Sequence, residues 1–315
     1  MTDDRFVLYT DSRYAERAPV ELAAVGSTAH VEIARSELGD KVGELLATAN
    51  SVALEADHVS WHQQGEIATK WLPDVELVPT TALLDALRAR KDHAEIARIR
   101  AAAEHVDQAL AVVKPMMRER PTERALAASI EAEIRRQGAD DIGFDAIVAS
   151  GPNGAIPHHA PGGRVIEAGD LVIVDIGGRV DGYRSDMTRT FCVGQMTTDQ
   201  ARHYEVVAAA QQAGVEAMVV GAQTSSVDAA ARAIITDAGW GDAFVHGTGH
   251  GVGLDIHEAP RVAANATEVY EDGTVATVEP GVYLSGIAGV RVEDTCVATA
   301  AGAERLTGFD KDPEV

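Results

Sequence analysis

The sequence predicts an α+β protein with a small amino-terminal α/β domain at residues 1–88 and a larger domain at residues 89–315. Two observations support this division. Residues 1 to about 85 alternate short apolar runs with helical stretches, and this segment is too short for a complete α/β domain. The chain beyond it opens with a long amphipathic helix and becomes rich in strands after Phe144.

The amino-terminal domain is predicted to hold both strands and helices. Apolar runs at Phe6–Tyr9 and Ser51–Glu55 are typical of strands. Residues 30–49 and 62–71 are predicted helices. Strands and helices that alternate in this way are the pattern of an α/β domain.

A single apolar stripe predicts the first helix of the larger domain, over residues 91–113. Its apolar positions recur at steps of three and four, namely Ile96, Ile99, Ala103, Val106, Leu110 and Val113. Asp92 and Glu95 form a capping box at its start. A second helix is predicted at residues 122–136, where Gly138 ends it.

The rest of the chain is predicted to hold two hairpins and further helices. The predicted strands are residues 145–150, 171–176, 187–193, 274–279 and 289–298, and the predicted helices are residues 198–218 and 225–238. Residues 177–182, with three glycines and an aspartate, have the composition of a turn between the predicted strands at residues 171–176 and 187–193. The order of two helices and a hairpin therefore occurs twice, which suggests a duplicated architecture.

The composition is that of an ordinary globular chain with a strong acidic excess. The 315 residues include 27 Lys and Arg against 49 Asp and Glu, for a formal net charge of -22. An acidic chain repels phosphate backbones, so we expect no nucleic-acid partner. No apolar run approaches the roughly 18 residues of a membrane span, and the first residues lack the features of a signal peptide. Cys192 and Cys296 cannot form a disulfide framework, so we expect a reduced, cytoplasmic compartment.

An acidic residue in an apolar strand marks the first part of a candidate site. Asp175 interrupts the run Leu171–Ile176, where an ionised carboxylate is costly unless it is paired, hydrogen-bonded or bound to a metal. In a hairpin centred between residues 180 and 181, Asp186 would face Asp175 directly. Opposed like charges destabilise a sheet. A cation between Asp175 and Asp186 would remove that cost.

A second pair of acidic residues repeats this arrangement. Glu279 ends the predicted strand at residues 274–279, and Glu293 lies in the next strand. Their positions centre on Gly286, inside the expected turn. The two glutamates are therefore predicted to oppose each other across a hairpin.

His250 lies in a glycine-rich stretch, Gly247–Gly253, between these two pairs in the sequence. Glycines allow a close approach of the backbone, and histidine is the commonest transition-metal ligand. Four carboxylates and one neutral imidazole carry a charge of minus four, which two divalent ions would balance. Such a donor set suits Mn²⁺, Co²⁺, Fe²⁺ or Zn²⁺ and does not choose among them. Two metals about 3.5–4 Å apart can hold a bridging hydroxide and polarise a carbonyl or phosphoryl oxygen.

Each of these five residues also has a simpler interpretation. Any one acid could cap a turn or form a structural ion pair, and His250 could be a turn histidine whose hydrogen bonds are satisfied. The five residues together, in this order and at these element positions, are much harder to explain in that way.

Seven short motifs carry a family resemblance. They are KDxxEIxxIR from Lys91, GPNGAIPH from Gly151, VDIG from Val174, SDMTRT from Ser185, HGTGHGVG from His246, VEPG from Val278 and GVRVEDT from Gly289. They resemble the motifs of the pita-bread metallopeptidases, in the branch of the Xaa-Pro aminopeptidases and Xaa-Pro dipeptidases (prolidases). The resemblance covers about residues 90–310 and implies a pita-bread catalytic domain behind a shortened amino-terminal domain.

The resemblance implies a metal-binding role for five residues, because every ligand position of the family holds the expected residue type. Asp175 would chelate one metal, and Asp186 and Glu293 would bridge two divalent ions, with Mn²⁺ or Co²⁺ favoured over Zn²⁺ or Fe²⁺. His250 and Glu279 would complete the second metal.

The resemblance also implies catalytic roles around these ligands. His158, His246 and His257 match non-ligand histidines that position the substrate and shuttle protons or stabilise the tetrahedral intermediate. Glu279 is the best candidate for a general base or proton carrier. Arg291 is expected to support either the bridging carboxylate or the carboxylate of the substrate.

Not every histidine near these motifs is expected to act. His246 could merely line the sheet. His159 lies next to His158 and is expected to be only its neighbour, because His158 fits the motif position.

The implied activity is hydrolysis of the peptide bond that precedes a proline, in a peptide with proline at its second position. The nitrogen of that bond is a tertiary amide and must be protonated as it leaves, which suits a site with several titratable groups. Three alternatives stay open: a methionine-aminopeptidase-like specificity, creatinase-like hydrolysis of another C–N bond, and a non-catalytic peptide-binding module. The full ligand set argues against the last two, because creatinase lacks the full metal set and the non-catalytic relatives have generally lost several ligands.

The front of the chain departs from the family pattern. Asp11–Tyr14 resembles a piece that normally lies well inside the amino-terminal domain, so about the first strand, helix and strand of that domain are missing. In relatives this domain helps form the dimer and can shape the substrate pocket of the neighbouring subunit. We expect a homodimer, and the shortening leaves its form and the preferred substrate length open.

Overall fold

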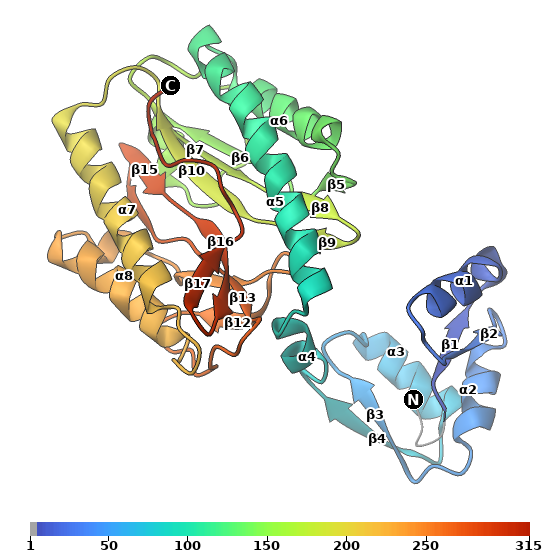
Figure 1. Cartoon of the computed structure of the whole chain (residues 1–315). Coiled ribbons are helices and arrows are strands. Elements are labelled where there is room, and N and C mark those ends of the chain that lie inside the picture. The colour runs from blue at the N-terminus through green and yellow to red at the C-terminus, as the bar shows by residue number, and fades with distance from the viewer. Residues whose placement is uncertain (1–4) are drawn as a thin grey trace. The chain divides into compact units, whose positions relative to one another are not determined.

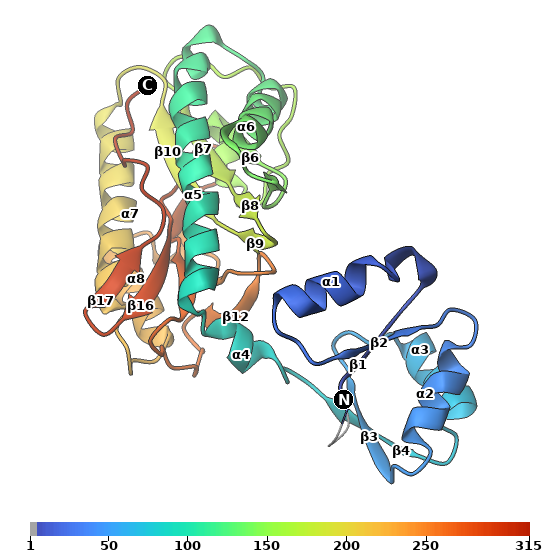
Figure 2. The same cartoon turned by 45° about the vertical axis from the view of Figure 1, so that its right-hand side comes forward.

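The computed structural model describes residues 5–315. The chain divides into two compact units, one that ends at Leu83 and one that comprises Leu84–Val315 (Figures 1 and 2). Both units combine helices and strands, which confirms the predicted α+β class. Among the described residues, no helix has both the length and the apolar character that a membrane span requires.

The first unit contains two small parallel sheets, β1–β2 and β3–β4. Its elements are β1 (Val7–Thr10), α1 (Arg17–Ala24), β2 (His30–Ile33), α2 (Leu38–Leu46), β3 (Ser51–Glu55), α3 (Trp61–Glu66) and β4 (Glu76–Thr80), with single helical turns at Ser12–Tyr14 and Ile67–Trp71. The prediction of one helix over residues 30–49 is wrong at its start. His30–Ile33 instead pairs with β1, because its backbone groups complete the hydrogen bonds of that strand.

The second unit begins with helices whose capping signals the sequence contains. Its first elements are α4 (Asp85–Ala89), α5 (His93–Val113), a helical turn at Lys114–Glu119, and α6 (Glu123–Gln137). The predicted capping box is confirmed, since the Asp92 side chain accepts from the backbone of Ala94 and Glu95 and Glu95 reaches back to Asp92. The predicted end of α6 is also confirmed, because Gly138 adopts a left-handed conformation with φ of 118°.

The strands of the second unit form four sheets, with the orders β10-β7-β6, β12-β11-β13-β16-β17, β14-β15 and β5-β8-β9. The strands are β5 (Asp141–Ile142), β6 (Ile147–Ser150), β7 (Leu171–Ile176), β8 (Gly178–Val180), β9 (Tyr183–Arg184), β10 (Met187–Cys192), β11 (Gly249–Gly251), β12 (Glu258–Val262), β13 (Val275–Val278), β14 (Gly281–Leu284), β15 (Ala288–Arg291), β16 (Asp294–Thr299) and β17 (Gly302–Arg305). The remaining helices are α7 (Thr198–Ala217) and α8 (Ser225–Asp237), with helical turns at Gly151–Ala155 and Gly241–Ala243.

Two pairs of helices flank these strands (Figures 1 and 2). Residues of α5 and α6 share one buried apolar cluster with β6, β7 and β10. Residues of α7 and α8 share a second cluster with β14 and β15. The strands between the helix pairs therefore sit in a rigid, buried setting, where their side chains are held in defined positions.

The first hairpin has a different register from the predicted one. Asp175 faces Thr188, not Asp186, so the predicted direct opposition of the two aspartates is wrong. The turn lies at Asp181 and Gly182, which have φ of 48° and 86°, one residue later than the predicted centre. Moving the centre by one residue shifts the pairing by two, which keeps Asp186 on the same face as Asp175 but makes it a diagonal neighbour.

The second hairpin has the predicted register. Val278 pairs with Asp294, and Gly281 pairs with Arg291, so the same pairing holds on both sides of Glu279 and Glu293. The turn contains Gly286, which has φ of 72°. Glu279 lies between β13 and β14, and Glu293 lies between β15 and β16. Neither glutamate belongs to a strand.

Candidate metal centre and active site

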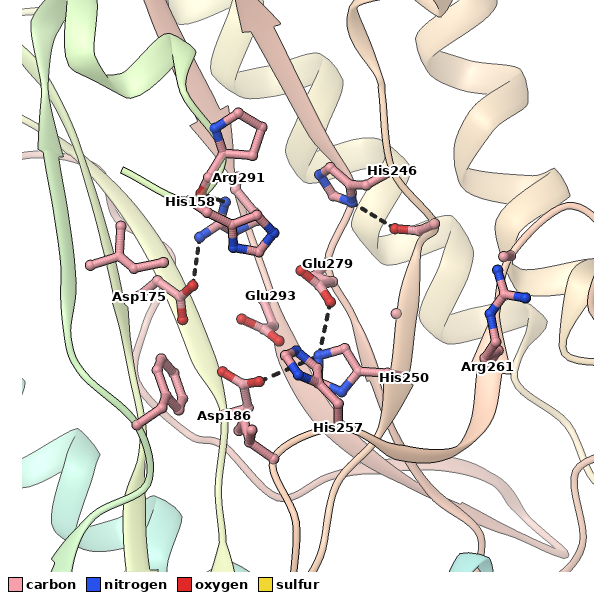
Figure 3. Close-up of a pocket in the computed structure, with 17 residues that line it drawn as sticks. His158, Asp175, Asp186, His246, His250, His257, Arg261, Glu279, Arg291 and Glu293 are labelled. Atoms are coloured by element: carbon pink, nitrogen blue, oxygen red, sulfur yellow. Dashed lines mark hydrogen bonds and ion pairs between the residues drawn. The ribbon is translucent and has the colours of Figure 1, made fainter. Parts of the chain in front are cut away.

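One pocket gathers every residue that the sequence predicts for the site. It is a cavity of about 310 Å³ that lies within the second unit. Its lining includes all of the predicted metal-binding and catalytic residues, namely His158, Asp175, Asp186, His246, His250, His257, Glu279, Arg291 and Glu293. Figure 3 shows the carboxylates of Asp186, Glu279 and Glu293 grouped around the ring of His250. The structure therefore brings together side chains from β7, β11 and both hairpins.

Three of these side chains are close enough to share one cation. Asp186, His250 and Glu293 each offer a ligand atom, and these atoms lie within 4.8 Å of one another. His250 Nε2 lies 3.6 Å from Asp186 Oδ2 and 3.2 Å from Glu279 Oε1 (Figure 3). Asp175 lies at the other side of Asp186 in the same pocket. The four carboxylates thus surround a small space that one imidazole enters.

The chemistry of this donor set fits bound divalent cations. Oδ1 of Asp175, Oδ1 of Asp186 and Oε1 of Glu293 are buried and have no hydrogen-bond partner among residues 5–315. A buried carboxylate oxygen without a partner is costly, and it is rarely tolerated in a well-packed protein. A cation at the centre of the pocket would satisfy these oxygens at once.

The pKa shifts of the buried carboxyl groups also favour a bound cation in the pocket. Burial raises the pKa of Asp186 and of Glu293 well above the ordinary value, and nearby carboxylates raise both further. Burial likewise raises the pKa of Asp175, although Arg291 opposes the effect. Without a cation the three carboxyl groups resist simultaneous ionisation. A bound divalent ion would favour the ionised form of each.

Glu279 and His250 form the exception, because each stabilises the charge of the other. Burial alone would raise the pKa of Glu279, but the hydrogen bond from His250 lowers it to about 2. Burial alone would lower the pKa of His250, yet the same contact raises it. This contact can hold a proton in the metal-free site, and a cation would take the place of that proton.

Glycines on both sides of His250 allow its strand to fit between two neighbours. A Cβ on Gly249 would lie 2.1 Å from the carbonyl oxygen of Thr277, and one on Gly251 would lie 2.1 Å from that of Ala259. The Nδ1 atom of His250 lies 3.1 Å from the carbonyl oxygen of Gly251. Since a carbonyl only accepts, Nδ1 carries a hydrogen. When a cation displaces the proton shared by Nε2 and Glu279, the lone pair of Nε2 is therefore free to bind that cation.

The guanidinium of Arg291 donates hydrogen bonds to several groups of the protein. Its Nη2 donates to Asp175 Oδ2 at 2.6 Å, and its Nη1 donates to the Tyr283 hydroxyl at 2.9 Å. Its Nε donates at 3.0 Å to the hydroxyl of Thr188, which in turn donates to Glu293 Oε2 at 2.7 Å. The guanidinium therefore supports Asp175 directly and the predicted bridging carboxylate through Thr188, and these contacts leave it poorly placed to bind a substrate carboxylate.

The non-ligand histidines differ in how the protein holds them. Nδ1 of His246 donates to the carbonyl of Gly247 at 2.7 Å, and its Nε2 accepts from Tyr283 at 2.9 Å. Burial lowers the pKa of His246. The ring of His257 packs edge-on against that of His250, with 4.3 Å between centroids. His158 is exposed in the pocket, so the three histidines approach the centre from different sides (Figure 3).

Several lining residues were not predicted from the sequence. They include Phe144, Ile147 and Arg261. Tyr283, whose hydroxyl contacts His246 and Arg291, was not predicted either. Arg261 pairs with His250 across β11 and β12, which places a second cation on the side of the pocket away from Arg291 (Figure 3). The only sequence signal for Tyr283 was its place after the VEPG motif. Arg261 had no signal of its own, because β12 was not predicted.

Two family models match the chain. The model described as metallopeptidase family M24 matches residues 97–300, and the one described as the creatinase/prolidase N-terminal domain matches residues 1–90. Together they account for both units of the structure.

Among similar proteins of known sequence are named peptidases. An Xaa-Pro dipeptidase of Pyrococcus furiosus is 42% identical over 226 residues, which cover 72% of this chain and 65% of that protein, just under two thirds of its length. The uncharacterized peptidase YqhT of Bacillus subtilis is 34% identical over 312 residues, which cover 99% of this chain and 88% of that protein.

Solved structures give the same result for the fold. An Xaa-Pro dipeptidase from Bacillus anthracis superposes with a TM-score of 0.93 at 34% identity, covering 100% of this chain and 88% of that one. An X-Pro aminopeptidase from Thermotoga maritima superposes with a TM-score of 0.90 at 29% identity, covering 100% of this chain and 89% of that one.

Proposed function

The chain belongs to metallopeptidase family M24 and has its pita-bread fold, and from that premise we propose that it hydrolyses the peptide bond before proline. Family membership implies divalent metal ions. The observation that carries the proposal is a set of buried carboxylate oxygens on Asp175, Asp186 and Glu293. They have no hydrogen-bond partner in the described part of the chain, and all three side chains share one pocket with His250. The Xaa-Pro specificity rests on the relatives, several of which are named Xaa-Pro dipeptidases or prolidases.

Five residues would hold two divalent ions in this proposal: Asp175, Asp186, His250, Glu279 and Glu293. Ions bound there would supply Lewis-acid polarisation of the scissile carbonyl and of the attacking water. We favour Mn²⁺ or Co²⁺, because oxygen donors with one imidazole suit these ions. A reduced, cytoplasmic setting and a homodimer belong to the same proposal, as do the domain limits at residues 88 and 89 and the shortened front.

The residues around the proposed ligands would have separate catalytic roles. Glu279 Oε1 is engaged by His250 and Thr277, which leaves Oε2 to take up a proton and deliver it to the leaving proline nitrogen. His158 and His257 present ring nitrogens to the pocket, where an N–H can donate to the oxygen on which negative charge develops. The chain of hydrogen bonds from Arg291 through Tyr283 fixes the tautomer of His246.

A short substrate fits the size of the site best. The cavity of about 310 Å³ lies at the small end of the range of about 300–1,000 Å³ for ligand pockets. We therefore favour a dipeptide with proline at the second position over a longer peptide. Methionine-aminopeptidase-like, creatinase-like and purely peptide-binding roles are not favoured, since the named relatives act on Xaa-Pro peptides.

The decisive experiment compares substrates on metal-stripped protein to which Mn²⁺, Co²⁺ or Zn²⁺ is added back. Release of proline from Xaa-Pro should depend on added metal and should exceed cleavage of Xaa-Pro-Yaa, with Met-Ala as the control peptide. Faster cleavage of Xaa-Pro-Yaa would instead make the protein an aminopeptidase. Peptide binding with no hydrolysis under any metal would overturn the enzymatic proposal.

A further inference from the structure

A buried carboxylate that does not line the pocket contacts a segment that does. Glu123 is the first residue of α6 and is fully buried, with 0% of its surface exposed. No strand or motif of the metal centre contains it. Its side chain nevertheless takes part in several hydrogen bonds, which come from the last residue of β6 and from the segment between β6 and β7.

These hydrogen bonds reach both ends of one loop. At the start of the loop, Glu123 Oε1 accepts from Ser150 N at 2.8 Å, from Ser150 Oγ at 2.7 Å and from Asn153 Nδ2 at 3.0 Å. Near its end, Glu123 Oε2 accepts from Gly162 N at 3.1 Å and contacts His159 Nε2 at 2.9 Å. One carboxylate thus closes the loop at residues 150–162, which we call the His158 loop.

The charge of Glu123 suits this task. Burial alone would raise its pKa, but hydrogen bonds from Ser150, Asn153 and His159 lower the pKa below the ordinary value. An ionised carboxylate only accepts, so His159 must present an N–H at Nε2. Hydrogen bonds to a charged acceptor are stronger than neutral ones.

His158 itself is held only through its neighbours. Within residues 5–315 its ring has no hydrogen bond or ion pair, and it is exposed in the pocket. The residue before it, Pro157, accepts a hydrogen bond at its carbonyl from Arg291 Nη1 at 3.1 Å. The residue after it, His159, contacts the Glu123 carboxylate. The position of the His158 ring therefore depends on two anchors, one on each side.

The fit of the loop against the adjacent strand leaves little freedom. A Cβ on Gly289 of β15 would lie 1.9 Å from the carbonyl oxygen of Gly154. The loop backbone thus packs directly against the strand that carries Arg291. If the anchor at Glu123 were lost, the loop would be held on that side alone.

From these contacts we propose that Glu123 is a positioning residue, which acts through His159 to hold His158 at the reaction centre. His159 then has a structural task of its own, in contrast to the expectation that it is only a neighbour. The catalytic consequence rests on the function proposed above, whereas the anchoring of the loop does not.

The main experiment replaces Glu123 by Gln, which keeps the shape of the side chain but places an amide N–H₂ among hydrogen-bond donors. We expect kcat/KM for Xaa-Pro to fall by about 10- to 100-fold with unchanged metal content, because a small misplacement of a catalytic group is costly. Glu133→Gln is the matched control. Glu133 is also buried on α6, but among the residues that the structure describes its carboxylate bonds only to Arg136 and Gln137 of the same helix end.

A second background separates positioning from general loss of stability. In a His158→Ala protein, Glu123→Gln should cost less than about 2-fold, because the group that it positions is already gone. His159→Ala should show the same dependence on His158 with a smaller loss, and it removes no buried charge. An equal loss in both backgrounds, or no loss from Glu123→Gln in the original chain, would overturn the proposal.

Hydrogen exchange of the holoprotein gives a readout that needs no activity. In Glu123→Gln, amides of residues 150–162 should exchange faster, while those of α5 stay unchanged. If the unaltered protein cleaves no Xaa-Pro peptide, the proposed function fails and this measurement alone decides the anchoring. Unchanged exchange in the loop would refute it.

Discussion

Carboxyl groups that repel one another define this protein at the scale of single residues. Asp175, Asp186 and Glu293 each keep a buried oxygen with no hydrogen-bond partner between Arg5 and Val315, and burial raises the pKa of all three. A fold that only needed stability would replace such groups with apolar ones. Their presence in one cavity is best explained by a ligand that carries positive charge.

Asp186→Asn tests this explanation. The change removes one charge from the centre, so we expect less bound Mn²⁺ per chain and a fall in kcat/KM of about 100-fold or more, since a metal supplies several kcal/mol of transition-state stabilisation. The metal-free variant should melt no lower than the metal-free original, because the repulsion with Glu293 is relieved. Elemental analysis and thermal melts with and without metal check both statements.

The control for that experiment is Asp237→Asn, at the exposed end of α8. It makes the same chemical change outside the pocket and should leave metal content unaltered. Equal metal content in Asp186→Asn and in this control would contradict the assignment of Asp186 as a ligand.

Close backbone approaches set the position of the site at the scale of elements. β11 is only three residues long, yet it brings His250 between β12 and β13. This is feasible because Gly249 and Gly251 have no Cβ to meet the carbonyl oxygens of the neighbouring strands. The same principle places the His158 loop against β15, where Gly154 and Gly289 meet.

Gly249→Ala should displace β11. The added methyl would lie 2.1 Å from the Thr277 carbonyl oxygen, so the strand must move, at a cost of about 1–3 kcal/mol as for other overpacked sites. We expect a lower melting temperature and weaker metal binding, measured by calorimetry. Gly163→Ala, with open space around its Cβ, is the comparison and should change neither quantity. Wild-type metal affinity in Gly249→Ala would show that β11 can shift without moving His250.

At the scale of the whole second unit, the carboxyl-terminal segment lies beside the candidate metal centre. The Lys311 Nζ lies 2.6 Å from Asp294 Oδ2, and Arg189 Nη2 lies 2.9 Å from Asp294 Oδ1. The carbonyl of Pro313 accepts from the backbone of Cys192 at 2.7 Å. Asp294 directly follows Glu293, so this buried ion network ties β10, β16 and the carboxyl-terminal segment together beside a candidate ligand.

Asp294→Asn should destabilise the unit by about 3–5 kcal/mol at neutral pH, because it leaves buried cations without their partner. Burial alone would raise the pKa of Asp294, but Arg189 and Lys311 hold it below the ordinary value. A lowered pKa in the folded state means that the stabilisation is complete above the unfolded pKa of about 3.9 and is lost as the pH falls further.

Urea unfolding of metal-stripped protein at pH 7, 5 and 3.5 measures this effect. The difference between the original chain and Asp294→Asn should be the same at the two higher pH values and smaller at the lowest one. A difference that grows on acidification would show that the carboxyl group is not ionised in the folded protein.

Much of the fold follows from local signals in the sequence. The capping box at Asp92, the left-handed Gly138 and the apolar stripe of α5 were all readable, because each depends on residues close together along the chain. The hairpin around Gly286 was predicted in register for the same reason. The first hairpin was misplaced by one residue, since turn chemistry extends over residues 177–182 and does not single out Asp181 and Gly182.

The sequence by itself determined which residue types belong to the candidate site, through acids in apolar strands and a histidine among glycines. Only the tertiary structure decided how they are held. Arg291 meets Asp175 across 116 positions of the chain, and Thr188 meets Glu293 across 105. Glu123 reaches His159 from a helix that no motif marks. Such contacts depend on the packing of distant elements, and no spacing along the chain encodes them.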